Sequence, residues 1–375
     1  MTDFGSFTAP VSARSERVRR VIVPFQDRSH LLRMDRNEDV PGWDEEHLRS
    51  VLARVQASDL AAYHDADLVQ MHLAEWLGVA RGNLTITAGS SEAIQMVFET
   101  YLDEGSGVLA LEPSYGLYEV FAAKCGAELI GFRFGDDLSL DIDGLVKRIG
   151  IVLPRLIVVA NPNQPTGTAM GLDEVRRIAD AALECGAVLL IDEAYFLFTQ
   201  VTAVGLCLEY PNVVVTQSFS KALGLAGLRL GYCVGPVERI REVGKLRALT
   251  QSNAFALAVA DYVLENIHWA LARVDDVIAG RDFLVARFRG ADLVTFSSQA
   301  NFVLLGCRSN AAAAELVDSI REQGFAIRGP LVGPPLDGFV RVTAGPLAMM
   351  QEFWRDTKPL FLEFASRRGT EPGSL

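Results

Sequence analysis

The stretch LIVVANPNQPTGTAMGLDEVRRIADAALECGAVLLI, residues 156–191, decides the fold. Its two ends, 156–160 and 187–191, are apolar at every position, which is typical of strands covered on both faces. Between them, residues 172–183 carry apolar side chains at helical spacing, and Gly186 suits the position just after a helix. A strand, a helix and a second strand in this order predict two parallel strands joined by a crossover helix.

Similar apolar runs recur on both sides of this unit and are separated by helical patterns. Together they predict an α/β fold, with a mainly parallel sheet flanked by helices in a large domain. The further predicted strands are LTIT at 84–87, GVLAL at 107–111, NVVVT at 212–216 and LRLGYCVG at 228–235.

The pattern changes after about residue 265. A long helical stretch is followed by NFVLLGC (301–307), GFAIRG (324–329) and GFVRVTAG (338–345), which alternate with helices. This predicts a smaller α+β domain that the N-terminal segment completes. We therefore expect an N-terminal arm and part of the small domain in 1–60, a large domain in 61–264 and the rest of the small domain in 265–375.

Composition excludes several classes of protein. The chain has 375 residues, with 47 acidic side chains against 35 Lys and Arg, and a net charge of −12 disfavours nucleic acid and anionic membrane surfaces. The N-terminal stretch is polar, and no 18-residue apolar run occurs, so we expect a cytoplasmic protein that does not enter a membrane. The five cysteines form no CxxC and the five histidines no HExxH, so no metal site is predicted.

Ligands of open α/β sheets gather beyond the carboxyl ends of the strands, so the residues after each apolar run matter most. After the first predicted strand, Gly89, Ser90 and Ser91 open a helix whose free N–H groups suit an anion, although a plain serine N-cap is the alternative. After the next strand comes Tyr115, which could stack on a planar ligand or be an ordinary core tyrosine.

Two later strand ends are also polar. The loop NPNQPTG at 161–167 is stiffened by prolines and carries several amides. Asp192 ends a fully apolar strand, where an ionised carboxylate requires a cation or strong donors. A helix N-cap or a buried ion pair would also explain this aspartate.

The stretch QSFSKALGLAGLRLGY at 217–232 follows the last parallel strand. Ser218, Ser220 and Arg229 offer hydroxyls and a planar cation that suit a phosphate, and Lys221 is a side chain able to form an imine. A phosphate cup, a stacking aromatic ring, a carboxylate for a ring nitrogen and an imine-forming lysine are together what pyridoxal 5'-phosphate requires.

These motifs resemble those of fold-type I pyridoxal-phosphate enzymes of the class I/II aminotransferase group, in particular the histidinol-phosphate aminotransferase-like branch. The resemblance extends from about residue 36 to 345. It is carried by SxSKAxGLAGLRLGY at 218–232, which is highly specific, and by DEAY at 192–195 and PTG at 165–167.

The resemblance implies roles for individual residues. Lys221 corresponds to the Schiff-base lysine and proton shuttle, Asp192 to the partner of the pyridine nitrogen, and Tyr195 to the hydrogen-bond donor to the ring oxygen O3′. The implied phosphate cup consists of Ser90, Ser91, Ser218, Ser220 and Arg229, and the implied stacking residue is Tyr115.

The resemblance also implies a homodimer and a substrate-binding group. Tyr63 matches the family tyrosine that reaches the phosphate of the neighbouring subunit, which places the sites at a subunit interface. Arg341 matches the arginine that holds the anionic end of the substrate, with Arg328 and Asn301 near it.

The sequence departs from the family pattern around the substrate. The residue before PTG is Gln164 where relatives have Asn, so either Gln164 or Asn163 contacts O3′. The N-terminal NENP of relatives is NEDVPG at 37–42, and TAGPLAMM at 343–350 lacks their acidic continuation. These departures do not support specificity for histidinol phosphate itself.

The expected function is therefore transfer of an amino group between an amino acid, or an amine derived from one, and a 2-oxo acid. A decarboxylase, lyase or cyclase acting on an amino acid is the alternative, because the geometry of the substrate pocket selects the bond that breaks. A non-catalytic transcription regulator would need an added basic DNA-binding domain, for which the short N-terminal arm leaves no room.

Overall fold

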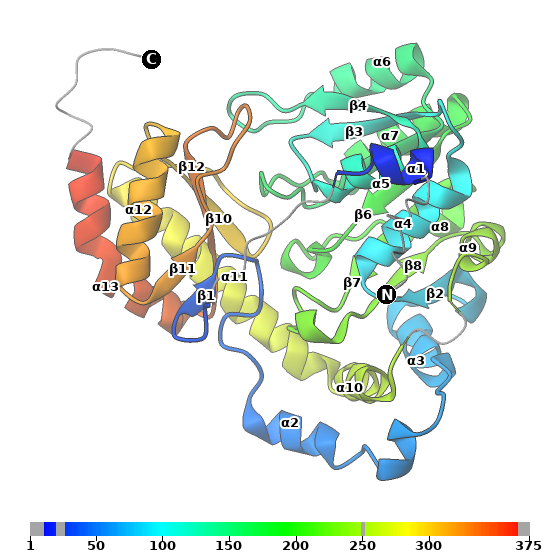
Figure 1. Ribbon diagram of the computed structural model, residues 1–375, viewed down its shortest axis with the longest axis horizontal. Helices are drawn as coiled ribbons and strands as arrows, with labels where there is room; N and C mark the ends of the chain where they lie inside the picture. The colour runs from blue at the N-terminus through cyan, green and yellow to red at the C-terminus, as the bar shows by residue number, and fades with distance from the viewer. Residues whose placement is uncertain (1–10, 20–26, 249–251, 367–375) are drawn as a thin grey trace, which may run out of the picture.

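A computed structural model gives the fold of residues 11–19, 27–248 and 252–366 (Figure 1). Its largest sheet has seven strands in the order β2-β8-β7-β6-β5-β3-β4. Strand β8 runs antiparallel to both of its neighbours, and the remaining pairs are parallel. The strands are β2 (Leu84–Thr87), β3 (Gly107–Glu112), β4 (Glu128–Arg133), β5 (Leu156–Ala160), β6 (Val188–Asp192), β7 (Val213–Ser218) and β8 (Gly231–Val234).

The mainly parallel sheet predicted from the sequence is confirmed, with two differences at its edges. Strand β4 was not predicted, because as an edge strand it is only partly buried and lacks a fully apolar run. The predicted strand at 228–235 is too long. Arg229 has a left-handed backbone, with φ of 55°, so the chain turns there and β8 begins at Gly231.

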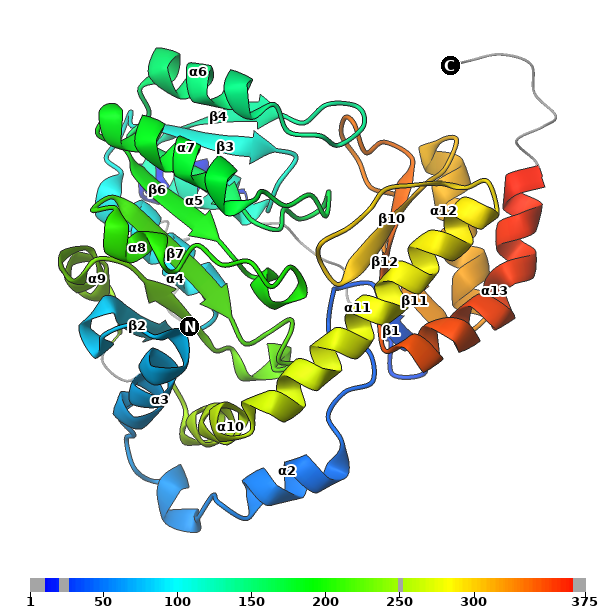
Figure 2. The same cartoon turned by 180° about the vertical axis from the view of Figure 1, so that it is seen from behind.

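Helices cover both faces of the large sheet (Figures 1 and 2). Leu190 of β6 packs on one face with α4, α5 and α9, whereas Leu189 and Ile191 pack on the other face against α7 and α8. This alternation explains why the central strands are apolar at every position. The helices are α3 (Asp67–Leu77), α4 (Ser90–Tyr101), α5 (Leu117–Cys125), α6 (Ile142–Val152), α7 (Leu172–Glu184), α8 (Leu206–Glu209), α9 (Val237–Gly244) and α10 (Ala254–Glu265).

Two small sheets lie beside the large one. Strand β10 pairs antiparallel with β9 and β12, and β1 from the N-terminal part of the chain pairs parallel with β11. Met34 of β1 therefore shares a hydrophobic core with Phe302 of β10. The elements are β1 (Leu32–Met34), β9 (Val294–Thr295), β10 (Phe302–Gly306), β11 (Phe325–Ile327), β12 (Phe339–Thr343), α11 (Ile267–Gly290), α12 (Asn310–Glu322) and α13 (Leu347–Ser366).

Helix α11 connects the two parts of the chain. It follows α10 directly, extends from the large sheet to the small sheets and packs along α13 (Figure 2). The N-terminal helices α1 (Ala13–Arg17) and α2 (Glu45–Leu52) lie on the outside. Within residues 11–19, 27–248 and 252–366, no helix combines the length and the apolar character needed to cross a membrane.

The contact between α11 and the start of α13 can be tested at Gly280. A Cβ there would lie 2.0 Å from the carbonyl oxygen of Gly345 and 2.9 Å from Cγ of Met350. Gly280→Ala should therefore lower the free energy of unfolding in urea by about 1–3 kcal/mol, the usual cost of overpacking.

Gly290, in the same helix, is the matched control, because a Cβ there would meet no atom within 4 Å. Gly290→Ala should leave the stability unchanged or raise it by up to about 1 kcal/mol, since alanine favours a helix more than glycine does. Equal effects of the two substitutions would contradict the close packing at Gly280.

Candidate active site

The carboxyl ends of β5, β6 and β7 and the first turn of α4 enclose a cavity of about 170 Å³. Every residue predicted to bind a cofactor lines this cavity, apart from Asn163 and Tyr63. The lining residues are Ser90, Ser91, Tyr115, Ala160, Pro162, Gln164, Asp192, Ala194, Tyr195, Ser218, Ser220, Lys221, Ala226 and Arg229.

Asp192, the last residue of β6, is only 5% exposed. Its Oδ2 accepts a hydrogen bond of 2.8 Å from the hydroxyl of Tyr118, and its Oδ1 accepts one of 3.2 Å from the N–H of Ala194. Among the described residues, no Lys, Arg or His forms an ion pair with it. Burial raises the pKa of Asp192 to about 6, although the hydrogen bonds oppose this rise. The carboxylate is therefore a buried charge that lacks a cation.

Lys221 also lies in the cavity, and none of the described carboxylates forms an ion pair with it. Its Nζ donates a hydrogen bond of 3.0 Å to the backbone oxygen of Arg36. Burial and the positive charges of Arg341 and Arg229 together lower the pKa of Lys221 to about 8, against the opposite effect of Glu38. A lysine amine in this state loses its proton near neutral pH far more readily than an exposed lysine does.

The first turn of α4 reaches the cavity because two glycines permit close contacts. Gly89, the N-cap, has φ of 81° and forms no side-chain cap, so the alternative of a plain serine N-cap is wrong. A Cβ on Gly89 would lie 2.7 Å from Nη2 of Arg229, and a Cβ on Gly231 would lie 2.5 Å from the nitrogen of Ser90. The guanidinium and the helix N-terminus are therefore adjacent.

This end of the cavity suits an anion. Nη1 of Arg229 is 3.3 Å from the backbone oxygen of Ala226 and 3.5 Å from Oγ of Ser220, and none of the described carboxylates pairs with the guanidinium. Ser218 accepts a hydrogen bond of 3.0 Å from the N–H of Ser220. An unpaired guanidinium, several hydroxyls and the N-terminus of a helix together match the requirements of a phosphate.

The loop after β5 places Gln164, and not Asn163, in the cavity. Oδ1 of Asn163 accepts a 2.7 Å hydrogen bond from Ser114, and its Nδ2 donates to the backbone oxygen of Pro113 and to Oγ1 of Thr166. Its amide is thus fully engaged in shaping the loop. Gln164 lines the cavity, and its Oε1 accepts a hydrogen bond from Tyr195.

The two cavity tyrosines are held by polar partners. The hydroxyl of Tyr115 is 3.0 Å from Oγ of Ser91. The hydroxyl of Tyr195 donates to Gln164 at 3.0 Å and accepts from Nδ2 of Asn37 at 2.9 Å. Burial raises the pKa of Tyr195 to about 12, so this hydroxyl keeps its proton at neutral pH.

Tyr118 and Asn37 are site residues that were absent from the predicted set. Tyr118 lies three residues after Tyr115, at the start of α5, and their rings meet edge to face with centroids 5.6 Å apart. That spacing alone could have suggested a second inward-facing tyrosine. Asn37 comes from the N-terminal part of the chain, and only the tertiary fold brings it to Tyr195.

The predicted substrate residues lie together but do not line the cavity. Arg341 of β12 is buried, its Nη2 donates to the backbone oxygen of Asp35 at 3.1 Å, and its Nε has no hydrogen-bond partner among the described residues. Oδ1 of Asn301 is likewise buried without a partner. Arg328 and Arg341 exchange two backbone hydrogen bonds. Phe302 links the group to the cavity, because its ring contacts both the guanidinium of Arg341 and the ring of Tyr195.

Tyr63 is not brought into the cavity of its own chain. Its side chain is 90% exposed, and it lies in a separate surface hollow with His64 and Phe255.

Residues 32–355 match the family model described as "Aminotransferase class I and II". The chain belongs to the class I and II aminotransferase family. That membership confirms the predicted aminotransferase activity, with pyridoxal 5'-phosphate as cofactor and amino and 2-oxo acids as substrates.

Named relatives agree with this family. Histidinol-phosphate aminotransferase 1 of Carboxydothermus hydrogenoformans is 30% identical over 321 residues, which cover 84% of this chain and 89% of that protein. The histidinol-phosphate aminotransferase of Chlorobium luteolum is 31% identical over 322 residues, 84% of this chain and 87% of that protein.

A solved structure confirms the fold-type I architecture of this aminotransferase. The histidinol-phosphate aminotransferase of Sinorhizobium meliloti, solved in complex with pyridoxal-5'-phosphate, superposes with a TM-score of 0.83 at 24% identity, covering 96% of this chain and 99% of that one.

In the described part of this chain, no group of three or more His, Cys, Asp or Glu side chains could hold a metal ion.

The cavity residues fit the cofactor of the family. Asp192 is a buried carboxylate without a cation, and Lys221 is an amine with a lowered pKa. Arg229 is a guanidinium that no described carboxylate pairs with, beside the helix N-terminus at Ser90. These groups match in turn a protonated ring nitrogen, an aldehyde and a phosphate.

Tyr118→Phe tests the support of Asp192. Loss of the donor should raise the pKa of Asp192 further, since the hydrogen bond stabilises the ionised form. Binding of pyridoxal phosphate to the apoprotein should therefore weaken on acidification at a pH about 1 unit higher than in the wild type.

Tyr101→Phe is the control, because Tyr101 ends the same helix, α4, that approaches the site, and its hydroxyl has no hydrogen-bond partner within hydrogen-bond geometry among the described residues. It should leave the pH dependence of binding unchanged. A Tyr118→Phe profile that coincides with the wild type would show that Asp192 does not depend on this bond.

Proposed function

We propose that the cavity residues carry out the amino-group transfer in the roles that the family resemblance implies. The observation that carries this proposal is that one cavity contains both a buried carboxylate, Asp192, and a lysine, Lys221, and that neither forms an ion pair with a described residue. Pyridoxal phosphate, when bound, supplies an electron sink that weakens the bonds to the α-carbon of an amino acid.

Lys221 binds the cofactor through Nζ and moves the proton of the substrate. Its pKa of about 8 leaves a useful fraction of neutral amine near neutral pH, which a general base at an α-carbon requires. The backbone oxygen of Arg36, which accepts from Nζ at 3.0 Å, orients the amine toward the cavity.

Asp192 faces the ring nitrogen of the cofactor and keeps that nitrogen protonated. A cation beside Asp192 would lower the pKa of the carboxyl group, reversing the effect of burial. Tyr195 and Gln164 contact the ring oxygen O3′, because their hydrogen-bonded pair lies in the cavity. This assignment selects Gln164 over Asn163, whose amide is engaged within its own loop.

Arg229, Ser90, Ser91, Ser218 and Ser220 hold the phosphate, and Tyr115 stacks on the ring. Support comes from the free N-terminus of α4 and from the unpaired guanidinium that lies over Gly89. An anion at this end would satisfy both groups at once.

Arg341, Asn301 and Arg328 bind the anionic end of the substrate. Nε of Arg341 and Oδ1 of Asn301 are buried without partners, which is costly unless a ligand completes them. We infer a carboxylate or phosphate on the amino donor. Histidinol phosphate, after which the relatives are named, carries such an anion. Transamination is favoured over decarboxylation, elimination or cyclisation because those relatives are named aminotransferases.

The protein is further proposed to act as a homodimer in the cytoplasm, with Tyr63 reaching the neighbouring site. Large apolar side chains before and after Tyr63 in the sequence are exposed, as expected of a surface that a second copy covers. They are Leu52, Leu60, Leu68 and Met71. Within each subunit we keep the division into 1–60, 61–264 and 265–375, since β1 and the sheet β12-β10-β9 lie apart from the seven-stranded sheet.

Lys221→Ala tests the proposed chemistry. The variant should fold but lose the visible absorption of bound cofactor, and kcat with an amino donor and a 2-oxo acid should fall by at least about 10⁴-fold. Lys147→Ala, an exposed lysine on α6, is the control and should match the wild type. Full activity of Lys221→Ala would remove Lys221 from the mechanism.

Mixed dimers test the shared site. Lys221→Ala and Tyr63→Ala subunits should each be nearly inactive alone. If equal amounts of the two are unfolded and refolded together, half of the dimers are mixed, and one of the two sites in each mixed dimer is intact, so about a quarter of the wild-type activity should return. The absence of any recovery, with dimers formed, would show that Tyr63 does not serve the neighbouring subunit.

A further inference from the structure

Glu193 follows Asp192 directly but points to the opposite face of the sheet. Because side chains alternate along a strand, Leu190 and Asp192 face α4 and α5, whereas Ile191 and Glu193 face the core on the other side. The same alternation in β7 places Ser218 in the cavity and Gln217 behind it. A second polar layer therefore lies one peptide unit behind the cofactor site.

The carboxylate of Glu193 has no exposed surface and accepts three hydrogen bonds of 2.6 Å. Its Oε2 accepts from Oγ1 of Thr202 and from Nε2 of Gln217, and its Oε1 accepts from the N–H of Ala203. In the described part of the chain, Glu193 has no ion pair. Burial raises the pKa of Glu193 to about 7, against the effect of these donors.

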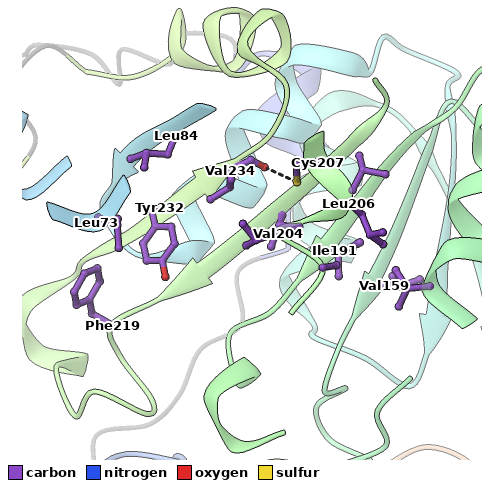
Figure 3. Close-up of a cluster of buried hydrophobic side chains, with 14 of the residues drawn as sticks. Leu73, Leu84, Val159, Ile191, Val204, Leu206, Cys207, Phe219, Tyr232 and Val234 are labelled. Carbon is purple, nitrogen blue, oxygen red and sulfur yellow. Dashed lines mark hydrogen bonds between the residues drawn. The ribbon is translucent and has the colours of Figure 1, made fainter. Parts of the chain in front are cut away.

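Gln217 extends this network to a third strand. Its Oε1 accepts a hydrogen bond of 2.5 Å from the hydroxyl of Tyr232 in β8. Figure 3 shows the ring of Tyr232 among Leu73, Leu84 and Phe219, with its hydroxyl at the end of the ring away from Leu84. The ring is thus fixed by packing, and the hydroxyl anchors the network to the core.

A carboxylate is a costly way to fill buried space, since an apolar side chain of similar volume avoids the loss of hydration. Hydrogen bonds from three donors are directional, so they fix the spacing between neighbouring strand ends, which apolar packing alone does not do. The residues joined in this way are the chain neighbours of cavity residues: Glu193 follows Asp192, and Gln217 precedes Ser218.

We propose that Glu193 is a positioning residue for the cofactor site, which ties the ends of β6, β7 and β8 together behind the cavity. By holding Asp192 and Ser218 at a fixed separation, it sets the distance between the group for the ring nitrogen and a group for the phosphate. This inference rests on the proposed roles of Asp192 and Ser218.

The test is the affinity of the apoprotein for pyridoxal phosphate, together with the visible absorption spectrum of the bound cofactor. In Glu193→Gln, the new NH₂ group faces either the N–H of Ala203 or the amide NH₂ of Gln217 as long as Tyr232 keeps donating to Oε1 of Gln217, so one donor loses its acceptor. We expect the Kd for pyridoxal phosphate to rise about tenfold, with a shifted absorption band.

The reciprocal double variant Glu193→Gln/Gln217→Glu should reverse the effect. It keeps one carboxylate and one amide. The carboxylate introduced at position 217 can accept a hydrogen bond from the amide at position 193 and another from the hydroxyl of Tyr232, which in the wild type donates to Gln217. We expect the Kd to return to within about threefold of the wild type.

Val213→Ala is the control for a general loss of stability. Val213 is fully buried at the other end of β7 and makes no side-chain hydrogen bond. It should lower the Tm while leaving the Kd within about twofold of the wild type. If Glu193→Gln does not fold, Thr202→Val takes its place in the test, because this variant removes one of the three hydrogen-bond donors to Glu193 and keeps the carboxylate. Thr202→Val should also raise the Kd for pyridoxal phosphate.

Two results would overturn the inference: a Glu193→Gln protein that binds the cofactor as the wild type does, or a weakened one that the reciprocal change does not restore. Both are compatible with the proposed function, because they leave cofactor binding by the wild type intact. Failure of the wild type to bind pyridoxal phosphate would instead contradict the proposed function itself.

Discussion

A buried carboxylate without a cation is the constraint on which the rest of the site depends. Asp192 ends an entirely apolar strand, and its carboxylate accepts hydrogen bonds from the hydroxyl of Tyr118 and from one backbone N–H. Burial is unfavourable for an ionised carboxylate, so a cation beside Asp192 would be strongly stabilised in the folded protein. A protonated ring nitrogen satisfies that preference, which explains why the fold, rather than the substrate pocket, specifies the cofactor.

Parallel strands bring the other groups to the same place. Because β5, β6 and β7 run in one direction, the residues after them meet at one edge of the sheet, and the N-terminus of α4 joins them across Gly89 and Gly231. Charge is distributed along the cavity accordingly. Asp192 and Lys221 line the cavity together with Arg229, whose guanidinium is adjacent to the helix N-terminus, and the positive charges of Arg341 and Arg229 favour the neutral form of Lys221.

Sequence patterns predicted most of this arrangement, and the misses have physical causes. Asp192 and Lys221 were found because each follows an apolar run, so that position along the chain implied position in space, and Arg229 was found because it shares the stretch 217–232 with Lys221. The sequence could not choose between Gln164 and Asn163, since both lie in one short loop, and only the hydrogen bonds of Asn163 within that loop separate them. Asn37 and Glu193 depend on contacts between distant segments, which no local pattern encodes.

The most direct measurement is a crystal structure of the wild-type protein grown with pyridoxal phosphate. The account predicts continuous density from Nζ of Lys221 to the cofactor, with a carboxylate oxygen of Asp192 about 2.7–2.9 Å from the ring nitrogen and the phosphate among Ser90, Ser218, Ser220 and Arg229. A cofactor bound in this cavity with its ring nitrogen turned away from Asp192, or bound elsewhere on the chain, would contradict the claim that the buried carboxylate specifies it.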